Sequence, residues 1–314
     1  MQLSGRTVML MLMMGLLLTG CEEPEPGEEP KPDINEAPYF FQFESEDFNE
    51  TVYDLTFSLG SMEYLVGLNS TAGVLAYGTD TLDFSVEDVP VVEYTADSSD
   101  MVIGSSWMDI STYNPLDHSI ASNQMIYFLR TVDYQWVKMR VVSATPSLFN
   151  IEYAIYTDGS GYGAVESVSV AYASDAPSHY SLTNGIVTQA NTWDMAMATT
   201  PEFSTELGSY FFMPTILFNH EKGVEVAIID DQDYSAITEV PENVTWIMDS
   251  SSDHSFGNGG TNQVLVYHPE PPYNHKVIVE NPALVYLVST SSQTYKLQFK
   301  EYSSGIVVFD YDAL

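Results

Sequence analysis

The sequence predicts an all-β protein built from two homologous antiparallel units. Beyond residue 38, short segments rich in Val, Ile, Tyr and Phe alternate with turn residues, which is typical of strands joined by tight turns. No segment after the leader has the apolar spacing of an amphipathic helix. The Asn and Gly-Val of residues 69–74 recur in 219–224, and residues 83–85 resemble 233–235 at the same offset, 150 residues. A fixed offset over separated segments indicates duplication of a folding unit.

Residues 1–20 are predicted to be a bacterial lipoprotein signal peptide. Arg6 precedes an apolar run over 8–18 that is too short to span a bilayer. The run ends in Leu-Thr-Gly-Cys at 18–21, which resembles a lipobox. Cys21 is the only cysteine of the chain, so we expect it to carry the lipid anchor, and disulfides are excluded. An ordinary secretory signal is the alternative.

Residues 21–37 are predicted to form a lipidated cysteine followed by a disordered tether. The segment is acidic and rich in proline, so it cannot bury enough apolar surface to become ordered. Glu22 replaces the Asp that commonly retains bacterial lipoproteins at the inner membrane. We therefore expect an outer-membrane lipoprotein on the periplasmic or cell-surface face, held to the membrane through Cys21.

The charge of the chain restricts its partners. Only 9 Lys and Arg accompany 44 Asp and Glu, giving a formal charge of −35. Nucleic acid binding needs a basic footprint, so this composition argues against it, and against anionic lipid surfaces too. We interpret the acidity as a solubility property. Calcium binding is the alternative, although the Asp-rich stretch at 230–233 lacks the ligand pattern of a calcium loop.

Three boundaries follow from the strand pattern and the repeat. The first β unit is predicted over 38–157 and the second over 165–314. Between them, residues 158–164 form a Gly-rich joint. Its glycines are closely spaced, but no helix follows them, which excludes a nucleotide-binding loop.

The order of several short motifs resembles the HmuY-like haem-binding lipoproteins, in two tandem and divergent copies. In the second unit these motifs are an aromatic strand with a Gly turn at 180–185, a Trp-Asp strand at 193–197, an Asn loop at 219, a Val-Pro pair at 240–241 and closing aromatic strands over 286–311. The Gly-rich run that the family carries after the Asn loop is absent from both units, as is its Arg after the Trp-Asp strand.

This resemblance implies capture of haem for iron acquisition, and transfer to an outer-membrane haem transporter. The family holds the iron between two neutral side chains. The matching residues in the second unit are His254 and His268, and imidazole suits this role. In the first unit Met101 would belong to a degenerate site, while the other ligand position falls near 108–112. No metal other than haem iron is expected. His118 and His275 are interpreted as ordinary loop residues.

The sequence does not indicate an enzyme. It contains no His-Glu-x-x-His zinc motif, no Gly-x-Ser-x-Gly elbow and no cysteine outside the lipobox. Acidic pairs are too frequent to be informative. The alternative to haem capture is a non-catalytic surface or adhesion-type β module that binds protein or glycan through exposed aromatic residues. Oligomeric state is left open.

Overall fold

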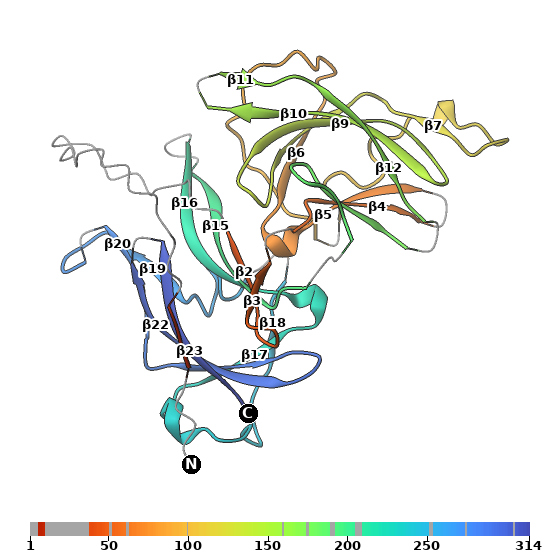
Figure 1. Ribbon diagram of the computed structural model, residues 1–314. Coiled ribbons are helices and arrows are strands. Elements are labelled where there is room, and N and C mark those ends of the chain that lie inside the picture. Colours follow the sequence, from red (N-terminus) through yellow and green to blue (C-terminus); the bar gives the residue numbers. More distant parts are fainter. Residues whose placement is uncertain are drawn as a thin grey trace.

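The computed structural model describes most of the chain after the tether. The described residues are 6–9, 38–49, 52–60, 63–98, 100–158, 160–173, 176–188, 192–204, 209–250, 254–273, 275–303 and 305–314. Within them the fold consists of antiparallel β-strands, and the helical segments are 3₁₀ turns of three residues, so the all-β prediction is confirmed (Figure 1). No helix in these residues is long and apolar enough to cross a membrane. Cys21 and the tether lie outside the described residues.

Among the described residues of the first half there are twelve labelled strands and two 3₁₀ turns. The strands are β1 (Arg6–Met9), β2 (Tyr39–Gln42), β3 (Asp47–Asn49), β4 (Leu55–Leu59), β5 (Tyr64–Leu68), β6 (Leu75–Thr79), β7 (Ile120–Ala121), β8 (Ile126–Arg130), β9 (Trp136–Thr145), β10 (Leu148–Thr157), β11 (Gly161–Tyr162) and β12 (Glu166–Ala171). The turns are η1 (Ser70–Ala72) and η2 (Ile110–Thr112).

The second half is likewise built from strands and 3₁₀ turns. Its strands are β13 (Ser178–Ser181), β14 (Gly185–Val187), β15 (Met195–Ser204), β16 (Ser209–Phe218), β17 (Glu225–Ile229), β18 (Ile247–Met248), β19 (Leu265–His268), β20 (Lys276–Val279), β21 (Val285–Ser289), β22 (Thr294–Ser303) and β23 (Ile306–Ala313). Its turns are η3 (His220–Lys222) and η4 (Tyr234–Ala236). The closing aromatic strands that the sequence predicts over 286–311 include the β22–β23 hairpin.

In the described residues, five sheets arrange these strands around two large cores, and two smaller apolar clusters lie beside them. The first core lies between the β14-β13-β4-β5 sheet and the sheet with the path β11-β10-β9-β8-β6. The second core lies between the β16-β15-β2-β3 sheet and the β1-β23-β22-β21-β17-β18 sheet. The β19–β20 pair forms a separate ribbon beside the second core. β1 belongs to the predicted signal peptide and pairs with β23.

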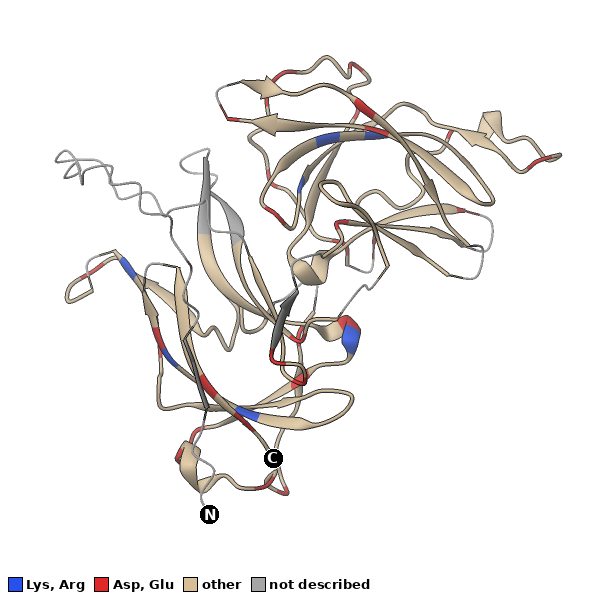
Figure 2. Cartoon of the chain, viewed as in Figure 1, with Lys and Arg blue, Asp and Glu red and all other residues tan. Residues whose placement is uncertain are grey.

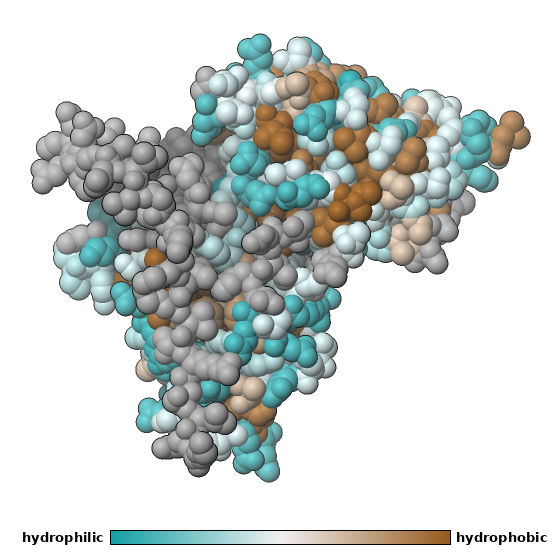
Figure 3. All heavy atoms as spheres, viewed as in Figure 1, coloured by the Kyte–Doolittle hydropathy of each residue, from teal (hydrophilic) through white to brown (hydrophobic). Residues whose placement is uncertain are grey.

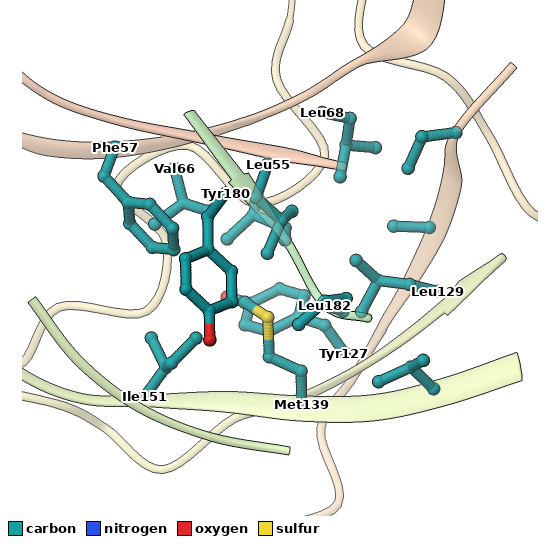
Figure 4. Packing of buried hydrophobic residues seen from close by; sticks show 14 of the residues in the cluster. Leu55, Phe57, Val66, Leu68, Tyr127, Leu129, Met139, Ile151, Tyr180 and Leu182 are labelled. Carbon is teal, nitrogen blue, oxygen red and sulfur yellow. The ribbon is translucent and has the colours of Figure 1, made fainter. Parts of the chain in front are cut away.

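The two cores exchange segments. β2, from the start of the chain, pairs with β15 across more than 150 residues of sequence, and Phe41 and Phe43 pack in the second core. In return, β13 pairs with β4, and Tyr180 and Leu182 pack in the first core. Figure 4 shows Tyr180 and Leu182 among side chains of the first core. The predicted unit boundaries at 157 and 165 follow the repeat, whereas spatial neighbours cross them in both directions.

The predicted joint also contributes to a sheet. Gly161 and Tyr162 form β11, which pairs with the end of β10. The Tyr162 ring packs against Phe128, and the Lys138 ammonium lies 4.4 Å from the centre of the same ring. These contacts fix part of the segment against a small apolar cluster of Tyr94, Ile126 and Phe128, separate from the first core.

A buried hydrogen-bond network recurs in both cores. The carboxylate of Asp54 accepts from the backbone N–H of Leu182 at 2.7 Å, and that of Asp194 accepts from the N–H of Phe43 at 2.9 Å. Each aspartate therefore holds the exchanged segment, because its backbone N–H also donates to Tyr180 or Phe41.

The Asn loops of the repeat have matching bonds as well. The amide groups of Asn69 and Asn219 donate to the carbonyls of Tyr53 and Trp193, and their side-chain oxygens accept from the third residue of η1 or η3. Gly73 and Gly223 then end these turns with φ of +83° and +77°, in the left-handed region that favours glycine. Such coincidence of buried polar contacts supports the predicted duplication.

The equivalent turns η1 and η3 face each other between the cores. The Thr71 hydroxyl lies 3.2 Å from Nε2 of His220, and the Tyr53 hydroxyl donates to Glu221 at 3.0 Å. These contacts join side chains 149 and 168 residues apart in the sequence. The repeated loops therefore form part of the contact between the two halves.

Candidate functional site

Met101 and His254 occupy equivalent positions in two matching turns. Asp97 accepts hydrogen bonds from the N–H groups of Leu68 and Val102, both at 2.7 Å. Asp249 does the same with Phe218 at 3.2 Å and Ser255 at 2.6 Å. In each case the second donor directly follows the candidate ligand, and a glycine lies three residues after it. The matched positions are Met101 with His254, Val102 with Ser255, and Gly104 with Gly257.

The surroundings of these two residues differ. Met101 is 48% exposed, so its thioether is accessible from solvent. His254 is half-buried, and its Nδ1 is buried within the protein.

His268 lies at the end of β19, on the separate ribbon. Its Nε2 is 2.7 Å from a carboxylate oxygen of Glu280, and its ring centre is 5.0 Å from that of Tyr273. Lys276 stands opposite His268 in the ladder with β20. A histidine that donates one ring N–H to a carboxylate has its tautomer fixed, which is the arrangement of many metal-ligating histidines.

The structure connects His254 and His268 through one segment of backbone. Two residues after His254, the carbonyl of Phe256 accepts from the N–H of Val264, where the ribbon strand begins. From Val264 to His268 the chain advances about 13 Å at roughly 3.3 Å per residue. The histidines therefore lie at the two ends of one short extended segment, and each is fixed by a different carboxylate.

The sequence did not reveal several residues near these positions. Asp97, Asp249 and Glu280 fix the candidate ligands, but acidic residues are too common in this chain for a pattern to single them out. The structure also places His118 and His275, interpreted from sequence as ordinary loop residues, against the phenols of Tyr113 and Tyr267. By that pairing, Asn114 rather than a residue of 108–112 corresponds to His268.

The buried aspartates of the two cores differ in their electrostatics. The Lys222 ammonium lies 2.5 Å from Asp194, which is 1% exposed. The corresponding residue in the first unit is Ala72, so Asp54 lacks this lysine. Burial raises the pKa of Asp54 to about 7, against the lowering effect of the N–H donors of Val132 and Leu182.

A shallow apolar cleft, whose lining includes none of the candidate ligands, lies between β2, β15, β16 and β23. Its lining is aromatic and aliphatic, and it contains no titratable group other than a tyrosine. The lining residues are Tyr39, Phe41, Met195, Met197, Ile216, Val307 and Phe309.

Charged residues do not build a metal centre in the described ranges. No group of three or more His, Cys, Asp or Glu is placed there to hold a metal ion. Figure 2 shows acidic residues distributed over loops and strands of both halves, with few basic residues among them.

In comparisons with known proteins, no protein-family model, no curated protein and no solved structure matched the chain. The geometry above therefore carries the functional argument.

Proposed function

We propose that the protein is an envelope-anchored, non-catalytic binding lipoprotein that captures haem with its second unit. One observation carries the proposal: Met101 and His254, two residue types that ligate haem iron, occupy the same position in matching turns. Each turn is held by an aspartate that accepts two backbone N–H bonds, the half-buried Asp97 in the first unit and the buried Asp249 in the second. Lipid attachment at Cys21, an outer-membrane location and transfer to an outer-membrane haem transporter belong to the same proposal.

The donor types of the second unit suit an axially ligated haem, whereas the positions of His254 and His268 at the two ends of an extended segment do not bring both imidazoles to one iron. His254 and His268 both supply imidazole, which needs no positive charge to bind iron. Glu280 would orient His268 by accepting a hydrogen bond from its Nε2–H group, which would leave the lone pair of Nδ1 to bind iron. Lys276, opposite His268, is the nearest basic residue in register for a propionate. Bound haem would supply the iron centre, and the protein would supply only orientation and partial shielding from water.

The ligand assignment is tested by titrating residues 37–314 with haemin and following absorbance. We expect a low-spin bis-imidazole spectrum that is lost in His254→Ala and in His268→Ala. Met101→Ala is the matched control, since it alters the equivalent turn of the first unit, and it should leave that spectrum unchanged. Circular dichroism checks that each variant is folded. A low-spin spectrum retained in both histidine variants would contradict the assignment.

A specific observation also favours the surface-module alternative. Apolar side chains project from the loop around η2, where Ile110, Tyr113 and Leu116 are 69%, 45% and 92% exposed. Exposed side chains of this kind can anchor a protein or glycan partner. If the alternative holds, the double change Ile110→Ser and Leu116→Ser should abolish partner binding. The unaltered chain should then show no spectrum of bound haem when haemin is added.

A further inference from the structure

Strand β23 becomes an edge strand of its sheet when the leader is removed. In the described residues β23 pairs with β22 on one side and with β1 on the other. β1 lies within the predicted signal peptide, so cleavage would leave the second side of β23, here called the β23 edge, without a neighbour. β23 has 8 residues and spans about 26 Å at roughly 3.3 Å per residue. Unpaired N–H and C=O groups along such an edge can bond an added strand.

The other edges of the two sheets around the second core have features that oppose strand addition. β18 has 2 residues and β3 has 3, which leaves little backbone to pair. β16 contains Pro214, whose nitrogen has no hydrogen to donate. β23 contains no proline, and its aspartates, Asp310 and Asp312, form ion pairs with lysines of the neighbouring β22 at 3.3 Å and 3.7 Å. The β23 edge therefore lacks the usual protection of an edge strand.

The apolar cleft of the second half lies directly behind the β23 edge. Val307 and Phe309 of β23 line it, together with Met197 of β15 and Tyr39 of β2. Residues directly opposite each other in an antiparallel ladder project to the same face of the sheet. A residue opposite Phe309 on an added strand would therefore point towards this cleft. Figure 3 shows mostly hydrophilic residues on the visible described surface of this half, so the apolar lining is a contrast that favours an apolar side chain as its occupant.

The leader strand shows which direction and register the β23 edge accepts. β1 runs antiparallel to β23, with position 8 opposite Phe309, position 9 opposite Val308 and position 6 opposite Tyr311. In the leader these positions carry Val, Met and Arg. The register thus combines an apolar residue on the face of the cleft with a basic residue towards the acidic end of β23.

We propose that in the mature protein the β23 edge binds an extended segment of a different protein as an antiparallel strand, with a branched apolar residue opposite Phe309 and a basic residue opposite Tyr311. Main-chain hydrogen bonds would supply affinity, and the cleft would supply specificity. Charge favours a different protein over a second copy, because two chains of formal charge −35 repel each other. The inference rests on leader removal, which belongs to the proposed function, and it requires no haem.

The test uses a fluorescent peptide with the sequence of residues 4–11 as the probe, and residues 21–314 with Cys21→Ser as the protein. Fluorescence anisotropy measures binding, and hydrogen exchange locates it. In one peptide variant Thr7→Pro and Val8→Pro remove backbone donors. Val8→Ser and Thr7→Ser form a matched pair, since adjacent positions of a strand project to opposite faces.

Two protein variants place the same positive charge on two different edge strands. Val308→Lys changes a half-buried residue of β23 whose neighbours Val307 and Phe309 are buried. Ile186→Lys is the matched control, because Ile186 is 55% exposed on β14, an edge strand of the first core. Circular dichroism checks that both variants are folded.

We expect saturable binding of the probe, with slower exchange of the amides of residues 308–311 and no change in β14. The double-proline peptide should not bind. Val8→Ser should weaken binding about tenfold through loss of apolar burial, while Thr7→Ser has little effect. Val308→Lys should weaken binding about tenfold or more, since a charge on an edge strand opposes strand addition, and Ile186→Lys should leave it unchanged.

Equal binding of the double-proline peptide, or equal binding by Val308→Lys and the unaltered chain, would overturn the proposal. A dimer of residues 21–314 in sedimentation equilibrium that Val308→Lys dissociates would assign the edge to a second copy and overturn the proposed occupant. The intact mass of the protein from its own cells tests leader removal separately. Absence of probe binding with a mass that begins at Cys21 would remove the edge site alone, whereas haemin binding is measured independently of both.

Discussion

A chain that lacks residues 38–49 is expected to lose the second core and retain much of the first. Those residues supply Phe41 and Phe43, which are 2% and 1% exposed and pack against Phe309, Tyr295 and Tyr311. Truncating one buried phenylalanine costs about 3–5 kcal/mol, and a typical domain is stable by only about 5–15 kcal/mol. Loss of both rings, together with the β2–β15 ladder, exceeds what the second core can tolerate.

Hydrogen exchange with mass spectrometry measures this effect segment by segment. In a chain starting at residue 52, amides of β21, β22 and β23 should exchange as in unfolded protein, while those of β8, β9 and β10 remain protected. A chain starting at residue 37 is the control and should protect both sets. Protection of β22 and β23 in the shorter chain would show that the exchanged segment is dispensable.

The stability of the protein is expected to fall as pH rises from about 4 to about 7. In the folded state the pKa of Asp54 is raised to about 7, whereas an unfolded aspartate has a pKa near 3.9. Between these values the folded state holds a proton that the unfolded state has released, so raising the pH favours unfolding. The window corresponds to about 4 kcal/mol at 1.36 kcal/mol for each pH unit. Burial also raises the pKa of Asp97 and Asp133, which adds to the same direction.

Urea unfolding at a series of pH values tests this dependence. Asp54→Asn should flatten the slope between pH 4 and 7, whatever its effect on absolute stability. Lys222→Ala should steepen the slope, because Asp194 would then be buried without its cation, as Asp54 is. At pH 8 we expect Lys222→Ala to lose about 2–3 kcal/mol. A slope in Asp54→Asn equal to that of the unaltered chain would refute the role of this carboxyl group.

Local strand structure was predictable from sequence because it depends on short-range alternation. The sequence predicts strands at 125–129, 136–142, 284–288, 295–299 and 306–311, and a hairpin between the last two. The structure has strands at each of these places, shifted by one residue at some ends. The repeat was visible because Asn69 and Asn219 each need a glycine four residues later to end a 3₁₀ turn. Asp54 and Asp194 also lie at matching places of the repeat, but their burial is seen only in the structure.

The exchange of segments between the cores was not predictable in this way. A single strand such as β2 carries information about its two faces but none about which distant strand it pairs with. Residues 39–43 and 180–185 both have the aromatic pattern that fits either core. Their assignment depends on the loops that precede Asp54 and Asp194, whose carboxylates hold Leu182 and Phe43 respectively.

Among the candidate functional residues, too, some positions are predictable from sequence and others are not. His254 and Met101 could be matched from sequence because both follow a repeated acidic segment. The Tyr113–His118 and Tyr267–His275 pairs could not, since their spacings along the chain, five and eight residues, differ. Only the left-handed backbone at each histidine brings the two rings into the same relation.

Haem capture is tested most directly by a haemin titration of the unaltered chain, residues 37–314, followed by absorbance before and after reduction with dithionite. We expect a saturable change of the Soret band in the ferric state, and a bis-imidazole spectrum that survives reduction. Spectra that remain the sum of protein and free haemin in both oxidation states would contradict haem capture, and would favour the surface module with exposed side chains such as Leu116.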